Sequence, residues 1–404
     1  MKKIMYRGLR QALTGVALSL ASVFAQAAVQ EITAEFRPDP TNPTLNKFTN
    51  TTPQSGICPG HIPARCEQLG ILSIRTWDIN FTANAPILVG AETRQGVMFK
   101  VPSDWRSFEV VSDKGERETV QMRIAGIGNR YDTIVGGTRS WGPYTFGNPP
   151  APCGRTGMFT GSSSYALWFW LVPEGAGVCS LDAIVDVPRL YYANFEYAYE
   201  LRTPNPLSMA AGQYRGAVSF SLGPNQDFDF GDLMIPNDET LTFNFTLDVD
   251  HIFKVEIPPG GDRIELIPQG GWQSWVQQGR RPTRLFRDQT FNIWSSGRFK
   301  MQLECQFPMG NTCGLQAASG EMVPLNIAVS LPGGIGDETG QRVNRQPLLL
   351  DGSTTRLFKP IHYVERRPGT LHFDIPASDV APLFVPGAPD RYAGTATLIW
   401  DSEV

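Results

Sequence analysis

The sequence predicts an all-β protein made of two β-sandwich domains in tandem. Short apolar or alternating segments recur along the chain, separated by clusters of Gly, Pro, Asn and Asp. The 40 glycines and 32 prolines fit many turns and few helices. Two strands, Tyr214–Leu222 and Tyr392–Trp400, open with the same Tyr-x-Gly pattern and then alternate in the same way. This recurrence suggests two domains that close with similar strands.

Residues 1–27 have the pattern of a signal peptide. Basic residues precede an apolar run from 12 to 24, and Ala25 and Ala27 are the small residues that a signal peptidase reads. A membrane anchor is the alternative interpretation, but the run is too short to span a bilayer with ease. Of the 35 basic and 39 acidic residues, the segment carries only basic ones, so cleavage after Ala27 leaves a more acidic chain. Such a charge argues against nucleic acid as a partner.

The six cysteines, an even number in an exported chain, predict three disulfides. Proximity in the sequence suggests the pairs Cys58–Cys66, Cys153–Cys179 and Cys305–Cys313, although fifteen connectivities are formally possible. The alternative is a metal site around Cys58, His61 and Cys66, which lacks a fourth ligand at a suitable spacing. We therefore expect disulfides, with no metal and no cofactor.

We expect a first domain at 28–235 and a second at 236–404. Strands expected in the first are Glu31–Arg37, Arg75–Phe81, Val97–Val101, Val120–Ile124, Tyr165–Val172, Phe195–Leu201 and the Tyr214 strand. Strands expected in the second are Leu241–Val249, Phe253–Ile257, Val323–Leu331, Leu371–Ile375 and the Tyr392 strand. The stretch from Asp227 through Asp238 is rich in Asp, and we expect it to be a solvated joint between the domains.

A long glycine-rich region, Gly126–Ser164, interrupts the first domain and carries arginine and aromatic side chains. Loops of this length in compact domains are usually functional or disordered. Aromatic faces beside guanidinium groups suit sugar rings and anionic groups. The alternative is a structural cover over one end of the sandwich, pinned by Cys153. The candidate ligand contacts in this region are Arg130, Arg139, Trp141 and Tyr144.

The sequence shows no catalytic motif. The four histidines are scattered, and neither a nucleophile elbow nor a phosphate-binding loop is present. Asn225, Asp227, Asp229 and Asp232 suggest a calcium site, but Phe230 stands where a calcium hand needs its glycine. We expect a protein that is not an enzyme. A secreted β-sandwich carbohydrate-active enzyme is the alternative, because folding brings distant carboxylates together in such enzymes.

Four motifs make the chain resemble the CblD-like pilus biogenesis initiators, the tip adhesins of class 5 chaperone–usher fimbriae. They are Tyr199-Glu-Leu-Arg-Thr-Pro-Asn-Pro-Leu, Gly212-Gln-Tyr-Arg-Gly running into Asp227-Phe-Asp-Phe-Gly-Asp, Gly270-Gly-Trp-Gln-Ser-Trp, and the Tyr-x-Gly-Thr terminal strand. The resemblance covers most of the mature chain and is densest from 195 to 404. The region 126–164 does not match the family pattern.

The resemblance implies an N-terminal adhesin domain, a short linker and a C-terminal pilin domain with an incomplete immunoglobulin-like fold completed by a donor strand. It further implies a periplasmic chaperone, an outer-membrane usher and a major pilin as partners, at the tip of a fimbrium on the bacterial surface. Attachment to host-surface glycoconjugates is the implied role, and Arg202 and Arg215 near the family-like motifs form a second group of candidate contacts. The alternative is a tip initiator that binds no receptor.

The resemblance also directs attention to the end of the chain. We expect the strand from Thr395 to Val404, with Tyr392 before it, to be the edge that pairs with a chaperone strand. Its large apolar residues are Leu398, Ile399 and Trp400, and an uncovered apolar edge is an aggregation hazard that a protein must manage. We expect a basic chaperone residue to hold the Val404 carboxylate. The alternative is that this strand only closes the sandwich, with its edge blunted by acidic residues.

Overall fold

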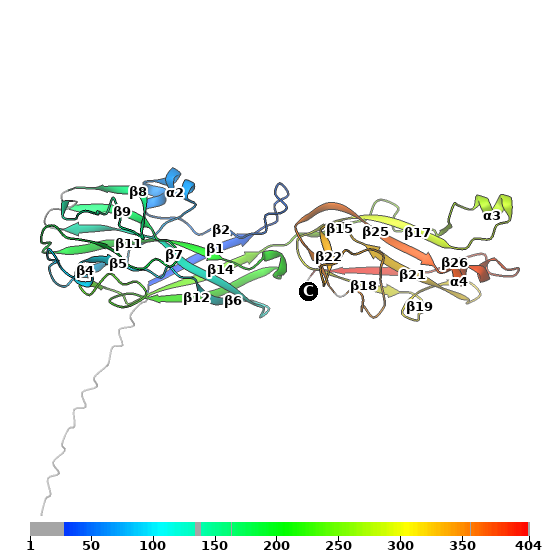
Figure 1. Ribbon diagram of the computed structural model, residues 1–404. Coiled ribbons are helices and arrows are strands. Elements are labelled where there is room, and N and C mark those ends of the chain that lie inside the picture. The colour runs from blue at the N-terminus through cyan, green and yellow to red at the C-terminus, as the bar shows by residue number, and fades with distance from the viewer. Residues whose placement is uncertain (1–27, 134–138, 163, 356, 403–404) are drawn as a thin grey trace, which may run out of the picture.

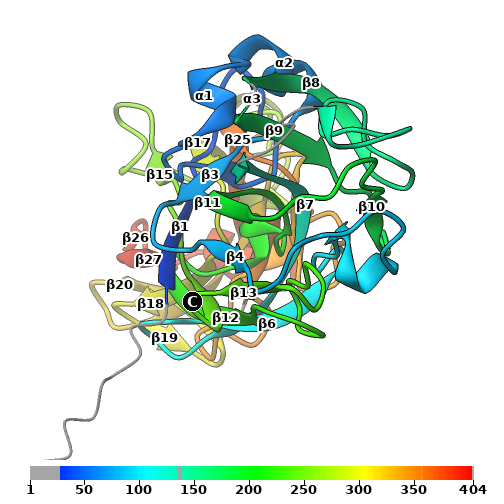
Figure 2. The same cartoon turned by 90° about the vertical axis from the view of Figure 1, so that its left-hand side faces the viewer.

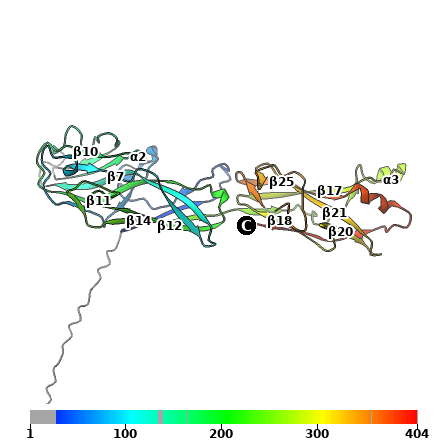
Figure 3. The ribbon, with the colours of Figure 1, turned by 60° about the horizontal axis from the view of Figure 1, so that its bottom comes forward.

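The computed structural model describes residues 28–133, 139–162, 164–355 and 357–402. It is an all-β fold of two β-sandwiches in tandem, as the sequence predicts, and the two bodies lie end to end in an elongated molecule (Figures 1 and 3). The expected signal peptide, residues 1–27, lies outside the described residues. Among the helices of the described part, none has the length and apolar character needed to cross a membrane.

The first half is built around one curled sheet. The strands of the first half are β1 (Ala28–Phe36), β2 (Thr49–Asn50), β3 (Ile74–Thr76), β4 (Phe81–Ala83), β5 (Val97–Phe99), β6 (Arg106–Ser112), β7 (Arg117–Thr133), β8 (Gly154–Gly161), β9 (Tyr165–Leu171), β10 (Cys179–Leu181), β11 (Leu190–Arg202), β12 (Gly212–Ser221), β13 (Met234–Pro236) and β14 (Thr240–Val249). Strands β5 and β10 pair with each other in a separate small sheet. The sheet order is β13-β4-β11-β7-β6-β12-β14-β1-β2. The sheet divides at β7, because the first part of this strand pairs with β6 and its last part pairs with β9.

Aromatic side chains dominate the core of the first half. The rings of Trp168, Trp170, Tyr131 and Tyr192 are fully buried, and Phe146 packs against Trp168, Trp170 and Tyr131. On the other face of β9, a smaller cluster lies beneath helices α1 (Ile57–Gly60) and α2 (Pro63–Leu69), which lie beside β8 and β9 (Figure 2). The continuous apolar run of β9 is therefore buried on both faces, as expected.

The first half extends to Val249, so the expected boundary at 235/236 is wrong. Strand β14 pairs in parallel with all of β1 and antiparallel with β12, and its inward side chains belong to the first core. The expected solvated joint is also wrong, because Phe228 and Phe230 are fully buried. The chain leaves the first half between Val249 and Phe253, where β15 begins. The alternating pattern of β14 is compatible with either domain. Only its pairing with β1 and β12 shows that it belongs to the first half.

The two Tyr-x-Gly strands do not close their domains in the same way. Strand β12 lies inside the sheet with β6 and β14 on its two sides. The second motif begins with Tyr392 on β26 (Tyr392–Ala393), which pairs with β20, and its remainder forms β27 (Ala396–Asp401), which pairs with β18. In the described residues, β27 has a partner on one edge only.

The second half is a smaller sandwich. Its other strands are β15 (Phe253–Glu256), β16 (Ile267–Pro268), β17 (Leu285–Ser295), β18 (Lys300–Cys305), β19 (Pro308–Met309), β20 (Thr312–Ala317), β21 (Met322–Ser330), β22 (Ile335–Asp337), β23 (Gln346–Pro347), β24 (Phe358–Pro360) and β25 (Val364–Ile375). The main sheet has the order β15-β17-β25-β21-β20-β19, and β18 pairs with β27 in a separate ladder. Helices α3 (Gln273–Gln278) and α4 (Ala377–Val380) lie at the pole farthest from the first half (Figure 1).

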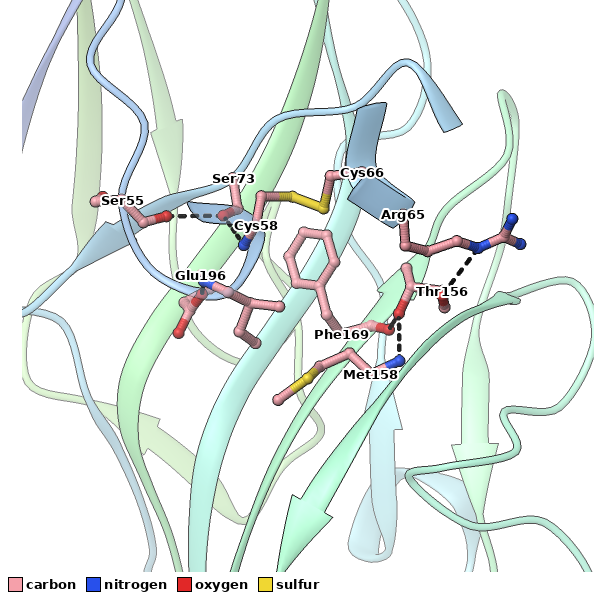
Figure 4. Close-up of a disulfide and its surroundings, with 10 residues drawn as sticks. Ser55, Cys58, Arg65, Cys66, Ser73, Thr156, Met158, Phe169 and Glu196 are labelled. Atoms are coloured by element: carbon pink, nitrogen blue, oxygen red, sulfur yellow. Dashed lines mark hydrogen bonds between the residues drawn. A yellow bond between two sulfur atoms is a disulfide. The ribbon is translucent and has the colours of Figure 1, made fainter. Parts of the chain in front are cut away.

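All three disulfides predicted from sequence proximity are present, and each lies within one half: Cys58–Cys66, Cys153–Cys179 and Cys305–Cys313. The first disulfide links α1 to α2. There the Cys58 amide donates to Ser73 Oγ at 2.9 Å, and the Ile57 amide donates to the buried carboxylate of Glu196 at 2.8 Å (Figure 4). Burial raises the pKa of Glu196, although Arg75 and the Ile57 amide act to lower it.

Candidate functional site

An apolar groove of about 580 Å³ opens along one side of the second half, between strands β15 and β27. Val255 and Ile257 line it from β15 and the segment after it, and Leu398 and Trp400 line it from β27. The floor is formed by apolar side chains of the main sheet and of its connections, among them Leu266, Leu315, Leu325, Leu371 and Phe373. These residues belong to the second core, or are half-buried against it. The groove therefore exposes part of a hydrophobic core.

Both strands beside the groove have one unpaired edge in the described residues. Strand β15 pairs only with β17, and β27 pairs only with β18. An unpaired edge presents a row of free backbone N–H and C=O groups, which form a template for another strand. The six residues of β27 offer about 20 Å of such an edge. The arrangement can therefore accept one added strand, with backbone hydrogen bonds on its sides and apolar side chains below it.

The predicted edge residues divide into three groups. Leu398 and Trp400 line the groove, and Trp400 packs against the ring of Phe291 with centroids 5.1 Å apart. Ile399 lies between them on the opposite face of the strand and does not line the groove. Tyr392 lies on β26, whose backbone pairs with β20, and it does not line the groove. Val404 lies outside the described residues.

The groove edge formed by β15 was not predicted as part of the site. The alternation of Phe253–Ile257 indicated a strand, but pattern alone does not say which edge of a strand stays unpaired. Ile257 is 46% exposed, which is unusual for a large apolar residue next to a core. Only the sheet order shows that β15 and β27 border the same groove.

Strand β27, on one side of the groove, ends close to the first half. Strand β27 runs toward the junction, where Ser402 lines a small cavity with Lys114 and Met209 of the first half. At the same junction, His251 Nε2 lies 3.0 Å from the Met209 carbonyl, and the Tyr363 amide donates to the Pro43 carbonyl at 3.1 Å. A strand that pairs with β27 therefore has the first half at one of its ends.

The region 126–164 is not one long loop. Its first residues continue β7 and residues 154–161 form β8, so among the described residues the irregular part is 139–153, and 134–138 lie outside the description. Trp141 is wrong as a ligand contact, because it is 3% exposed and packs against Phe146 in the core. Tyr144 and Arg139 are exposed. Arg130 lies over the Tyr165 ring at 4.5 Å and forms an ion pair with Asp132.

The second group of candidate contacts lies elsewhere. The Arg202 guanidinium lies 3.9 Å from the centre of the Trp105 ring, and Arg215 is 3.6 Å from a carboxylate oxygen of Asp113. Arg202 pairs in register with Gln121, nine residues before Arg130 along β7. At the rise of a strand, nine residues along β7 place Arg202 about 30 Å from Arg130. The structure therefore does not bring the predicted arginines together into one site.

A serine, a histidine and an aspartate meet on three strands of the second half. His372 Nδ1 lies 2.7 Å from Asp288 Oδ1, and its Nε2 lies 2.8 Å from Ser330 Oγ. The arrangement resembles a hydrolase triad. It could not be predicted from the sequence, because the three residues are far apart in the chain. Ser330 Oγ also accepts a hydrogen bond from the Arg345 amide, and Ser330 lines neither the groove nor the junction cavity. The network joins strands β17, β25 and β21.

Within the described ranges, no group of three or more metal-binding side chains could hold a metal ion. The aspartates considered for calcium bind arginines instead. Asp229 and Asp232 both form ion pairs with Arg94, at 2.8 and 2.7 Å, and Asp227 pairs with Arg106. Arg106 contributes to lowering the pKa of Asp227 against the opposing effect of its burial.

Neither a protein-family model nor a curated protein sequence matches this chain. Among solved structures, a chain from the chaperone–tip adhesin complex of CFA/I fimbriae biogenesis is 9% identical, with a TM-score of 0.23, and the match covers 94% of this chain and 97% of that one. A chain from the CsuC–CsuE chaperone–tip adhesion subunit complex of archaic Csu pili of Acinetobacter baumannii is 8% identical, with a TM-score of 0.21, covering 93% and 98%.

Proposed function

We propose that this chain is the tip subunit of a chaperone–usher fimbria, and that its second half is a pilin domain completed by a strand from another protein. The observation that carries the proposal is the apolar groove between the two unpaired edges of β15 and β27. A partner strand that pairs with both edges removes free backbone groups from water and covers Leu398 and Trp400. The role is one of assembly and binding, without catalysis.

The tip position is supported by the place of β1. After cleavage at residue 27, the mature chain begins with β1, which pairs along its whole length with β14. The Ala28 nitrogen donates a hydrogen bond to Asp238 at 3.0 Å. With cleavage after Ala27, β1 is engaged in its own sheet and is not available to complete another subunit. We therefore propose that the chain accepts a strand and does not donate one, as the first subunit of a linear fibre.

The partners that we propose are those that the family resemblance implies. In the periplasm, a chaperone strand fills the groove, and an N-terminal segment of the major pilin replaces it at the outer-membrane usher. A matched pair of variants tests the groove: Leu398→Glu places a charge into it, and Ile399→Glu places the same charge one residue along, on the opposite face. We expect chaperone co-purification to be lost for the first variant and kept for the second.

A donor peptide separates loss of docking from loss of folding. Wild-type protein released from the chaperone should gain thermal stability when a synthetic N-terminal segment of the major pilin is added, because the peptide binds only the folded state. The proposal is wrong if the mature protein without any partner is a soluble, fully folded monomer that the peptide does not stabilise. Normal chaperone capture of both variants would also contradict it.

We further propose that the first half is an adhesin domain that binds a surface glycoconjugate. The support is the exposed group of Arg139 and Tyr144, with the partly exposed Arg130 in the same half. The chaperone-bound full chain should bind glycans on an array, and the triple alanine variant of these residues should bind less. A tip initiator without receptor binding is the alternative, and it predicts that neither protein binds glycans or cells.

A further inference from the structure

The segment Gly270–Arg281 at the outer pole of the second half has a surface that the groove does not explain. Helix α3 has six residues and no capping side chain, and a helix this short is not stable alone in water. Trp272 and Trp275 hold it by packing on Phe384, with ring centroids 6.2 and 5.3 Å apart. The helix ends at Gly279, whose φ is 62°, a conformation that favours glycine.

This packing leaves large apolar side chains in water. Val276 is 77% exposed, Val385 beside Phe384 is 46% exposed, and Trp272 is 39% exposed. Trp272 and Val276 are four residues apart, so they lie on the same side of the helical turn. Scattered apolar residues on a surface need no explanation, but a contiguous apolar patch marks an interaction site.

Two charged residues border the patch. Arg280 and Arg281 directly follow the helix and are both exposed. No ion pair joins either guanidinium to an acidic residue in the part of the chain that the structure describes. The surface therefore combines an apolar centre with unpaired positive charge at its rim, and complements a partner face that is apolar with acidic residues around it.

The position of the groove identifies the occupant. The first half lies at the end of β27, where Ser402 lines a cavity with Lys114 and Met209, so we place the body of the donor subunit at the opposite, outer pole. Strand β27 runs from this pole toward the junction, so a strand paired antiparallel with β27 ends at the pole and continues into the body of its own subunit (Figure 1). That body then lies against α3 and the segment after it.

We propose that Trp272, Val276, Val385, Arg280 and Arg281 form a docking surface for the folded body of the subunit that donates the strand. The inference rests on the proposed function, because it assumes that a strand from another subunit enters the groove. It adds a second contact outside the groove, which holds the donor subunit in a fixed orientation at the pole. It also gives the motif Gly270-Gly-Trp-Gln-Ser-Trp a role in assembly.

Two probes separate the surface from the groove. The first is a synthetic peptide with the N-terminal segment of the major pilin, which fills only the groove. The second is the complete pilin subunit, which reaches the groove and the pole together. The test variants are Val276→Asp and the double variant Arg280→Glu/Arg281→Glu, because all three side chains are exposed. The matched controls are Ile361→Asp, 62% exposed, and Arg367→Glu, both near the junction end of the second half.

We expect both test variants to bind the peptide like the wild type and to bind the complete subunit at least tenfold more weakly, with both controls unchanged. Unaltered binding of the complete subunit by the test variants would overturn the docking surface and leave the groove intact. If wild-type protein binds neither probe, the proposed function itself is wrong. If a variant loses the peptide as well, circular dichroism decides whether it has unfolded, and a folded variant that loses both probes contradicts the separation of the two contacts.

Discussion

Arg298 in the second half donates a hydrogen bond to the carboxylate of Glu116 in the hairpin between β6 and β7 of the first half. The other oxygen of Glu116 accepts from the Tyr214 hydroxyl at 2.7 Å. Burial acts to raise the pKa of Glu116, but Tyr214 and Arg298 outweigh it and the pKa is lowered. The carboxylate therefore joins a buried tyrosine of one sandwich to an arginine of the other.

Replacing Arg298 with Gln should loosen the junction between the halves. The pair is partly exposed, so we expect a cost of only about 1 kcal/mol in unfolding free energy, but a clear gain in flexibility, because a contact between the halves is lost. Hydrogen exchange of residues 112–117 and small-angle scattering measure the change. Arg367→Gln, on the exposed face of the second half, is the control. Exchange that stays as slow as in the wild type would show that the other junction contacts are sufficient.

His251 should make stability depend on pH. Burial lowers its pKa below 6.5, even though the hydrogen bond to the Met209 carbonyl and the charge of Asp250 act to raise it, while Arg298 also lowers it. The unfolded chain then binds more protons than the folded one just below pH 6.5. Stability from this group is fully present above pH 6.5 and falls as the pH decreases through the interval between the two pKa values.

The His251→Gln variant checks this effect, because Gln can donate and accept hydrogen bonds but does not titrate in this range. We expect urea unfolding of the wild type to lose more stability between pH 7.5 and pH 5 than that of the variant. Other titrating groups contribute equally to both proteins and cancel in the difference. Equal losses in the two proteins would mean that His251 stays accessible to protons in the fold.

Glu196→Gln should strongly destabilise the first half. The carboxylate is fully buried and accepts from Arg75 Nε at 2.6 Å, so its neutral replacement leaves a largely buried guanidinium without a counter-charge. Breaking a buried pair from one side costs about 3 kcal/mol. Urea unfolding measures this loss of unfolding free energy. The control is Glu109→Gln, which removes the charge from the exposed ion pair with Arg117. For the control we expect a loss of less than about 0.5 kcal/mol. Similar losses at the two sites would contradict the importance of burial.

The double variant Cys58→Ser/Cys66→Ser should lose about 2.5 kcal/mol of stability, from the loop entropy that an eight-residue separation restores to the unfolded chain. The loss should appear first as faster hydrogen exchange in α1 and α2, because each helix is too short to persist alone. Thermal unfolding under non-reducing conditions gives the total effect. A variant with unchanged exchange in both helices would show that Ser73 and Glu196 hold this segment without the disulfide.

The strands and disulfides could be predicted from the sequence because alternation, turn residues and cysteine spacing are local signals. We predicted a loop at 126–164 because the region is rich in glycine, but Gly128 lies within strand β7. A side chain at this position would collide with Phe169 and the Trp168 backbone, so the glycine permits close packing of the strands. We predicted a solvated joint at 227–232 because the segment is rich in aspartate, but Asp229 is buried and forms an ion pair with Arg94. The groove itself depends on which strand edges remain unpaired, and this is a property of the complete sheet.

The parallel ladder between β1 and β14 sets an order for the folding of the first half. Its two strands are separated by more than two hundred residues in the chain, since Ala28 pairs with Leu241. Contacts between such distant segments form late, after the intervening chain has been synthesised. Until residue 249 has emerged, β1 and β12 lack their shared neighbour and expose apolar edges. A fragment that ends at residue 235 should therefore aggregate, whereas one that ends at residue 250 has every strand of its sheet.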